Sequence, residues 1–190
     1  MFDQLLKGIK IVVFDIDDTL LLWEHNKRWK DKTLEIKRAF IPDNEWDALN
    51  ITTDVYKDVQ INYAIKGGLL KTINQINKNI YKNSTSAQIK VFALSADTST
   101  YAMHNKINKL TAEFPDDFYR ENILYCDTSQ QKIIVLNTLC NIYNYKANEI
   151  LLIDDLQSTL MEADSKGYRV ESLQNIMNEW IINTDAGFII

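Results

Sequence analysis

The chain has 190 residues, and 46% of them are hydrophobic, which is enough to bury the core of one domain and excludes a disordered protein. Its 21 basic and 26 acidic residues give a formal net charge of -5, so the overall charge does not attract nucleic acid. A local basic cluster is nevertheless present, at Lys27, Arg28, Lys30 and Lys32.

The amino terminus and the cysteines indicate where the protein works. Residues 1–10 carry charged side chains among apolar residues too sparse for a signal peptide, and no apolar run approaches membrane-spanning length. Cys126 and Cys140 are too few to form a metal site alone, so we expect both to be core thiols. The sequence therefore predicts a cytoplasmic protein that does not contact a membrane.

An apolar stretch that ends in acidic residues is the first strong signal. Residues 9–14 are rich in β-branched side chains, typical of a strand buried on both faces of a parallel sheet. Asp15, Asp17 and Asp18 follow at its carboxyl end, where open α/β sheets bind ligands. Carboxylates this close repel one another, and a hard divalent cation such as Mg²⁺ would relieve the repulsion. The residues alone also allow a solvated acidic turn.

The next interval of the chain, residues 23–66, has weaker patterns. Helical spacing over residues 34–40 ends at Pro42, and a second helix is predicted at residues 44–49. Gly67-Gly68 is interpreted as a break before the next helix. The apolar stripe of that helix is formed by Leu69, Ile73, Ile76 and Ile80.

The middle of the chain repeats the order of strand, polar residue and helix. A second buried strand is predicted at residues 88–94 and ends at Ser95, which could bind a ligand or cap the following helix. That helix should run from Thr98 to Phe114, and a short strand follows at residues 122–126. Lys132 then lies in the first turn of another helix. It is either a solvated surface lysine or the partner of an anion, because a cation at a helix start opposes the helix dipole.

A fourth strand, at residues 149–153, again ends in acid. Asp154 and Asp155 follow it, either as metal ligands or as capping residues for a helix over residues 156–166. Gly167 should end that helix, before a short strand and a last helix that opens at Ser172. Strands and helices alternate throughout, which predicts an α/β protein: a doubly wound parallel sheet with helices on both faces.

These pieces together resemble the motifs of a known family. Asp15-x-Asp17-x-Thr19, Ser95, Lys132 and Asp154-Asp155 are similar in order and spacing to the four motifs of the haloacid dehalogenase (HAD) superfamily phosphatases. The resemblance extends over about residues 9–170. It implies a Rossmann-like three-layer α/β/α fold, with residues 1–190 as a single HAD-like domain. Residues 23–66 would then form a flap and at most a small helical cap.

The resemblance also implies roles for the four aspartates. Asp15 would be the nucleophile that becomes an aspartyl phosphate, and Asp17 would act as general acid and then as general base. Mg²⁺ is the implied cofactor. Its protein ligands would be Asp15, Asp155 and the main-chain carbonyl of Asp17, with Asp154 either behind them or bound through water.

Three further residues would serve the substrate phosphate. Ser95 would donate to a phosphoryl oxygen, and Lys132 would hold the same group while compensating the charge of Asp15. Thr19 would orient the loop that carries Asp17. Asp18 has no role in this scheme and is expected to point to solvent.

The implied activity is Mg²⁺-dependent hydrolysis of a phosphate monoester. Asp17 favours a phosphatase over a dehalogenase, because a halide leaves without a proton. A phosphotransferase with the same site, a non-catalytic binding module of the same fold and a receiver-like signalling domain are the alternatives. The last of these fits poorly with Thr19 and Ser95.

The substrate class stays open at the level of the sequence. A phosphorylated substrate is the expected partner, either a macromolecular phosphate such as a nucleic-acid end, or a nucleotide or sugar phosphate. Trp23 and Trp29, with the nearby lysines, could stack on a base and hold its backbone, or could simply pack in the core or flap. The oligomeric state is not indicated.

Overall fold

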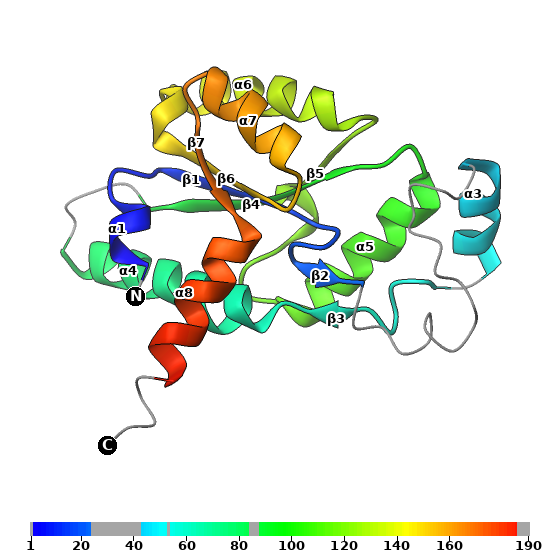
Figure 1. Ribbon diagram of the computed structural model, residues 1–190, viewed down its shortest axis with the longest axis horizontal. Coiled ribbons are helices and arrows are strands. Elements are labelled where there is room, and N and C mark those ends of the chain that lie inside the picture. The colour runs from blue at the N-terminus through cyan, green and yellow to red at the C-terminus, as the bar shows by residue number, and fades with distance from the viewer. Residues whose placement is uncertain (1, 24–42, 53, 84–87, 186–190) are drawn as a thin grey trace.

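The structure is a computed structural model of the chain, and it describes residues 2–23, 43–52, 54–83 and 88–185 (Figure 1). The helix predicted over residues 34–40, the basic cluster at residues 27–32 and Trp29 lie outside the described residues. Within the described ranges, no helix combines the length and the apolar character that a membrane crossing requires.

A parallel sheet forms the centre of the molecule. Its five strands have the order β5-β4-β1-β6-β7, and all neighbouring strands are parallel. The strands are β1 (Ile11–Asp15), β4 (Lys90–Ala96), β5 (Ile123–Cys126), β6 (Ile150–Asp154) and β7 (Arg169–Ser172). The predicted doubly wound parallel sheet is therefore confirmed, and β1 with its terminal Asp15 occupies the middle position.

Helices cover both faces of this sheet, and β1 shows why (Figure 1). Its side chains alternate: Ile11 and Val13 enter one apolar cluster, and Val12 and Phe14 enter the other. Both faces of β1 are buried, which is why its sequence is an almost continuous run of apolar residues. One cluster is covered by α6 (Lys132–Tyr143) and α7 (Gln157–Ser165), and the other by α4 (Lys71–Asn83), α5 (Thr100–Glu113) and α8 (Leu173–Asp185).

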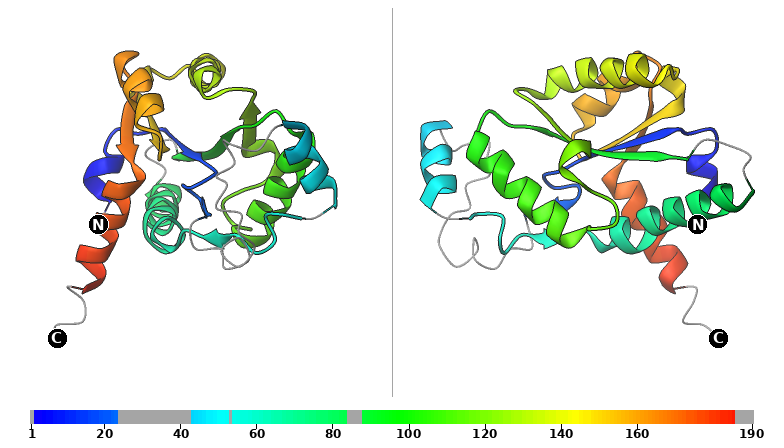
Figure 2. Two further views of the ribbon diagram at one scale, coloured as in Figure 1. Left: turned by 45° about the vertical axis from the view of Figure 1, so that its right-hand side comes forward. Right: turned by 180° about the vertical axis from the view of Figure 1, so that it is seen from behind.

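The described parts of the segment between β1 and α4 form a small second sheet and a helix. Strand β2 (Leu21–Leu22) pairs with β3 (Gln60–Ile61) in an antiparallel two-stranded sheet, with Leu21 opposite Ile61. Helix α3 (Asp43–Thr52) lies beside α5, as the two views of Figure 2 show. The described elements of this segment and of the connections are α1 (Asp3–Leu6), β2 (Leu21–Leu22), α3 (Asp43–Thr52), β3 (Gln60–Ile61), η2 (Ile65–Leu70), η3 (Arg120–Asn122), η4 (Ser129–Gln131) and η5 (Ala147–Glu149). Helix α3 contains the helix predicted at residues 44–49.

The break predicted at Gly67-Gly68 is wrong. Both glycines lie inside η2, a π-helical segment that continues directly into α4. A Cβ atom on Gly68 would lie 2.6 Å from Cε3 of Trp180 and 3.0 Å from Cε2 of Phe2. The glycine is therefore required because the indole of α8 packs against the helix at this point, and no chain reversal is involved.

Other local predictions concern helix ends and thiols. Gly167 has a φ of +83° after α7, as expected of a residue that ends a helix in the left-handed conformation. The Ser172 hydroxyl accepts a hydrogen bond of 3.2 Å from the main-chain amide of Asn175, and α8 begins at the next residue, so the last helix opens at Ser172 as predicted. Cys126 is a buried free thiol, as predicted, whereas Cys140 is free but only half-buried.

Candidate active site

The carboxyl ends of the three central strands meet at one edge of the sheet. Register places Asp15 opposite Leu94 of β4, and Phe14 opposite Ile153 of β6. One residue further along, β4 carries Ser95 and β6 carries Asp154. The candidates from three separate parts of the sequence are thus adjacent, as parallel pairing requires.

A tight turn follows Asp15. The carbonyl oxygen of Ile16 accepts hydrogen bonds from the amides of Leu20 at 3.0 Å and Leu21 at 2.9 Å. Asp18 has a φ of +55°, in the left-handed region that aspartate tolerates better than most residues. Its carboxylate accepts a hydrogen bond of 3.1 Å from the Trp23 amide. Asp18 was expected to point to solvent, but it is half-buried because its side chain holds this turn.

Lys132 joins Asp15 to Asp154. Its Nζ donates to Oδ1 of Asp15 at 2.5 Å and to Oδ2 of Asp154 at 2.8 Å, and only 2% of the lysine is exposed. Lys132 is therefore not a solvated surface lysine. Burial by itself lowers the pKa of Lys132, but the two carboxylates raise it above its ordinary value, so the ammonium stays charged.

The carboxyl groups of Asp15 and Asp155 are desolvated and lie close to other negative charges, which raises the pKa of both. Burial raises the pKa of Asp15, and the Asp154 and Asp17 charges raise it further against the opposing effect of Lys132. Burial and the charges of Asp154 and Asp18 likewise raise the pKa of Asp155 to about 6. One lysine does not balance this group of acids, so an additional positive charge would be stabilised here.

A divalent cation fits the arrangement of these oxygens. Asp15, Asp154 and Asp155 each offer one carboxylate oxygen, and the three oxygens lie within 4.8 Å of one another. Opposite ligands of an octahedral Mg²⁺ lie roughly 4 Å apart, so the spacing suits such an ion. Both oxygens of Asp154 are already engaged, by Lys132 and by the Leu156 amide at 2.9 Å. Asp15 and the exposed Asp155 are therefore the better placed ligands.

A second buried lysine, Lys106 of α5, was not among the residues predicted from the sequence. Its Nζ lies 2.6 Å from Oδ2 of Asp17, 2.9 Å from Oδ2 of Asp97 and 2.7 Å from Oγ of Ser95. The lysine has an exposed fraction of 0%. A signal was present in the sequence, because Lys106 falls at helical spacing within an otherwise apolar stripe. The buried members of this stripe are Ala102, Met103, Lys106 and Leu110.

Ser95 is part of this cluster and does not cap a helix. The cap of α5 is Ser99, whose hydroxyl accepts a hydrogen bond of 3.1 Å from the Ala102 amide. Ser95 is buried, with 1% exposed, and its Oγ accepts from Lys106. The structure thus brings Ser95 together with Asp17 through a common ammonium.

Asp17 is held on its other oxygen by two aromatic side chains. Nε1 of Trp23 donates to Oδ1 at 2.9 Å, and the Tyr56 hydroxyl donates to the same oxygen at 3.1 Å. The rings of Trp23 and Tyr56 pack edge to face, with centroids 5.0 Å apart. Burial raises the pKa of Asp17, but Lys106 and these hydrogen bonds outweigh burial and hold the pKa below its ordinary value.

Thr19 lies at the end of the turn and is completely buried. Its Oγ1 has no hydrogen-bond partner among the described residues. Its carbonyl oxygen, in contrast, accepts a hydrogen bond of 2.9 Å from the Asn62 side chain. The backbone of Thr19 is thus fixed within the turn that carries Asp17.

The comparisons with known proteins bear on the fold. No family model and no curated protein matches this sequence. Among solved structures, the chain is similar to HAD family enzyme bt-2542 from Bacteroides thetaiotaomicron in its magnesium complex, with 14% identity, a TM-score of 0.52 and coverage of 87% of this chain and 93% of that chain. The protein has the haloacid dehalogenase fold. A haloacid dehalogenase-like family hydrolase from Xanthomonas campestris is similar too, with 13% identity, a TM-score of 0.51 and coverage of 85% and 81%.

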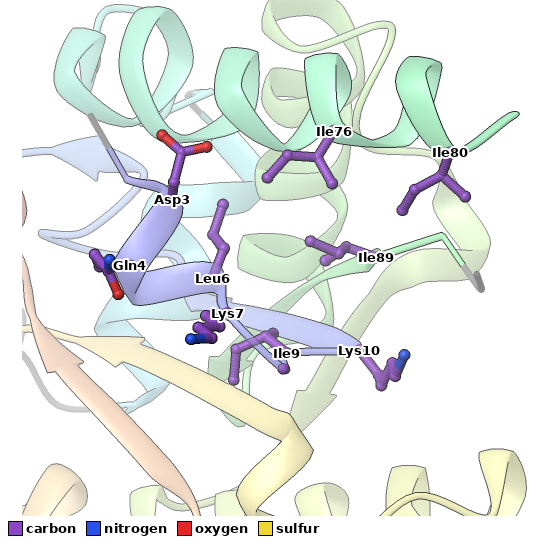
Figure 3. Close-up of a pocket in the computed structure, with 10 residues that line it drawn as sticks. Asp3, Gln4, Leu6, Lys7, Ile9, Lys10, Ile76, Ile80 and Ile89 are labelled. Atoms are coloured by element: carbon purple, nitrogen blue, oxygen red, sulfur yellow. The ribbon is translucent and has the colours of Figure 1, made fainter. Parts of the chain in front are cut away.

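The HAD fold predicted by resemblance is therefore confirmed. It is the fold that aligns the four sequence motifs with the carboxyl edge of the sheet. A separate pocket lies elsewhere, between α1, α4 and the beginnings of β1 and β4 (Figure 3). Leu6, Ile9, Ile76, Ile80 and Ile89 line it with apolar surface. It contains none of the candidate site residues, which lie at the opposite end of the sheet.

Proposed function

We propose that this protein is a Mg²⁺-dependent phosphatase that hydrolyses a phosphate monoester through an aspartyl phosphate on Asp15. One observation carries the proposal: Asp15 stands at the end of the central strand, in contact with the Lys132 ammonium and with a carboxylate oxygen within 4.8 Å of those of Asp154 and Asp155. A nucleophile that is oriented by a cation and flanked by metal ligands is what phosphoryl transfer requires.

The proposed first step is attack by a carboxylate oxygen of Asp15 on phosphorus. A bond forms between Asp15 and phosphorus while the bond from phosphorus to the leaving oxygen breaks. Lys132 contacts the nucleophile and neutralises charge on the transferred group. Ser95 would donate a hydrogen bond from its hydroxyl group to a phosphoryl oxygen, and Thr19 would keep the turn that carries Asp17 in place.

Asp17 is the proposed proton carrier. The pKa of Asp17 lies below its ordinary value in the free protein, so Asp17 would take up a proton as the phosphate monoester binds and then pass it to the leaving oxygen. Its carboxylate would next accept a proton from the water that hydrolyses the aspartyl phosphate. Proton transfer of this kind contributes roughly 10²–10⁴ to a rate. Asp17 stands two residues after the nucleophile and its side chain is 34% exposed, so it is accessible to a substrate.

Mg²⁺ would be held by Asp15 and Asp155, with Asp154 and the carbonyl of Asp17 completing the set proposed from the resemblance. When bound, the ion supplies positive charge that reduces the repulsion between these acids and an anionic substrate. The HAD family enzyme bt-2542, whose fold is similar, was crystallised with magnesium.

The substrate is proposed only as a class, a phosphate monoester. Residues 23–66, which we propose as the flap and small cap, would select among macromolecular, nucleotide and sugar phosphates. Trp23 packs edge to face against Tyr56 and Trp46, which favours a packing role over base stacking.

The test is phosphate release from p-nitrophenyl phosphate, nucleotides, sugar phosphates and phosphorylated oligonucleotides, with Mg²⁺ and with EDTA. Asp15→Asn should abolish release from every substrate. Asp116→Asn, the same change at an exposed aspartate, should leave release unchanged. Mass spectrometry that detects a phosphorylated acceptor in place of inorganic phosphate would indicate a phosphotransferase. Turnover that persists in Asp15→Asn or in EDTA contradicts the proposal.

A further inference from the structure

We propose that Lys106 is a positioning residue that holds Asp17 and Ser95 in their working orientations. This inference deepens the proposed phosphatase function and rests on it. Lys106 belongs to none of the four motifs, and it lies on α5, which contributes no other candidate residue. Its contacts nevertheless join two candidate site residues from different parts of the chain.

Each of the three N–H donors of the Lys106 ammonium has an acceptor. A lysine ammonium has three N–H donors and no acceptor. Lys106 has three acceptors within 2.6 to 2.9 Å, one each on Asp17, Asp97 and Ser95. Burial lowers the pKa of Lys106, but Asp17 and Asp97 raise it above the ordinary value, so it is a cation. With all three donors engaged, Lys106 can act on a substrate only through its partners.

Asp97 is the anchor of this arrangement. Its Oδ2 accepts from Lys106 at 2.9 Å, while its Oδ1 accepts from the Ser99 amide at 2.9 Å. Asp97 is 5% exposed, so both bonds lie away from bulk water. The turn from β4 into α5 therefore fixes the position of the ammonium.

For Asp17, the ammonium completes a set of donors around the carboxylate. Lys106 holds Oδ2, while Trp23 and Tyr56 hold Oδ1. The three donors come from α5, from the residue after β2 and from the connection between α3 and β3. Together they leave the carboxylate little freedom to rotate about its χ angles.

For Ser95, the ammonium decides the direction of the hydroxyl proton. Oγ accepts a hydrogen bond of 2.7 Å from Lys106, so the serine proton must point away from the ammonium. Ser95 is then available as a donor toward an anion such as a phosphoryl oxygen. Without Lys106, this hydrogen bond would no longer fix the direction of the hydroxyl proton.

The experiment is a pair of double-mutant cycles on the full chain, with p-nitrophenyl phosphate as substrate. The first cycle combines Lys106→Met with Asp17→Asn and measures kcat. The second combines Lys106→Met with Ser95→Ala and measures the inhibition constant of inorganic phosphate. Interacting residues give non-additive effects in such a cycle, whereas separate structural defects add.

The effect of Lys106→Met should depend strongly on whether Asp17 and Ser95 are intact. Lys106→Met should lower kcat about tenfold in the native background and less than about twofold beside Asp17→Asn. It should weaken phosphate inhibition about tenfold in the native background and less than about twofold beside Ser95→Ala. Lys109→Met, one turn further along α5, removes a lysine bound to Glu113 and the Lys57 carbonyl, and should change neither quantity.

Lys106→Met leaves the carboxylates of Asp17 and Asp97 without their cation, which can prevent folding. In that case a second variant, Asp97→Asn, tests the same inference. Asp97→Asn keeps Lys106 but weakens the ion pair that holds it. It should lower kcat and phosphate inhibition less than Lys106→Met does, and again less beside Asp17→Asn or Ser95→Ala than in the native chain. Equal losses in both backgrounds would overturn the proposal for Lys106. If wild-type protein releases no phosphate, or if Asp15→Asn is fully active, the proposed phosphatase function fails instead.

Discussion

The side-chain amide of Asn62 donates a hydrogen bond of 2.9 Å to the carbonyl oxygen of Thr19, 43 residues earlier in the chain. Asn62 is 1% exposed, and its Oδ1 accepts a hydrogen bond of 3.0 Å from the Ala64 amide. One side chain thus connects the turn of Asp15 and Asp17 to the beginning of η2. The position of the turn that carries Asp15 and Asp17 therefore depends on a residue outside all four motifs.

Asn62→Asp should reduce both stability and activity. The new carboxylate still accepts from Ala64, but it faces the Thr19 carbonyl without a proton to donate. The loss of a buried hydrogen bond with an unpaired partner costs about 1–3 kcal/mol. Urea unfolding measures this change, and phosphate release should fall because the turn shifts.

Asn77→Asp is the matched control for Asn62. Asn77 also pairs its side-chain amide with a backbone group, donating to the Ile89 carbonyl at 2.9 Å and accepting from the Ile89 amide at 2.8 Å. Its partner Ile89 precedes β4, at the opposite end of this strand from Ser95, so Asn77→Asp should lose stability while each folded molecule keeps its activity. Parallel losses of activity in both variants would show that Asn62 has no specific link to the site.

Tyr56→Phe should remove one hydrogen bond to Asp17 while keeping the packing of the ring against Trp23. It deletes the hydroxyl that donates to Oδ1 of Asp17, while Trp23 and Lys106 keep their contacts. We expect unfolding free energy to fall by about 1 kcal/mol and kcat to fall less than about tenfold. Tyr63→Phe, at a tyrosine that is 68% exposed, should be silent in both assays. A silent Tyr56→Phe would mean that this hydroxyl does not help to hold Asp17.

The stability of the metal-free protein should depend on pH through Asp155. Its pKa is raised to about 6 in the folded protein, above the value of about 4 for an unperturbed aspartate. The protonated form is therefore favoured by folding. Its stabilising contribution is complete below about pH 4 and is lost as the pH rises through about 6. Thermal unfolding in EDTA from about pH 4.5 to about pH 8 measures the trend, and Asp155→Asn should reduce it.

Magnesium should remove that trend. Mg²⁺ binds the carboxylate forms of its ligands, so its affinity should fall as the pH drops through about 8 for Asp15 and through about 6 for Asp155. This loss of affinity offsets the stability that the metal-free protein gains at low pH, so the melting temperature in saturating Mg²⁺ should change little over the range where the EDTA curve falls. An affinity that is independent of pH between about 5 and about 7 would exclude Asp155 as a ligand. Calorimetric titration with MgCl₂ provides the measurement.

Gly68→Ala should destabilise the junction of η2 and α8. The added methyl group would lie 2.6 Å from the Trp180 ring, and such overpacking costs about 1–3 kcal/mol. At Gly67 the nearest atom would be 3.4 Å away, so Gly67→Ala should be tolerated and could gain up to about 1 kcal/mol from helix propensity. Thermal unfolding of the two variants compares them directly, and equal melting temperatures would contradict the tight contact.

Local patterns were sufficient for the fold and for the order of the motifs. Buried strands such as β1 appear as continuous apolar runs, and parallel strands bring their carboxyl ends to one edge of the sheet. Periodicity therefore suffices to place Asp15, Ser95 and Asp154 together. Gly67-Gly68 was misinterpreted because a glycine that makes room for a distant indole looks the same in a sequence as one that breaks a helix.

The sequence by itself determined an α/β sheet with acids, a hydroxyl and a lysine at the ends of its strands, because those features depend on periodicity and on short separations along the chain. Only the tertiary structure decided how these groups are connected. Lys106, Tyr56 and Asn62 contact the turn that carries Asp17 from at least 39 residues away along the chain, the separation of Tyr56 and Asp17. Such contacts depend on how helices and loops pack over the sheet. Helical spacing can place Lys106 on a buried face, but it does not say which residues Lys106 meets there.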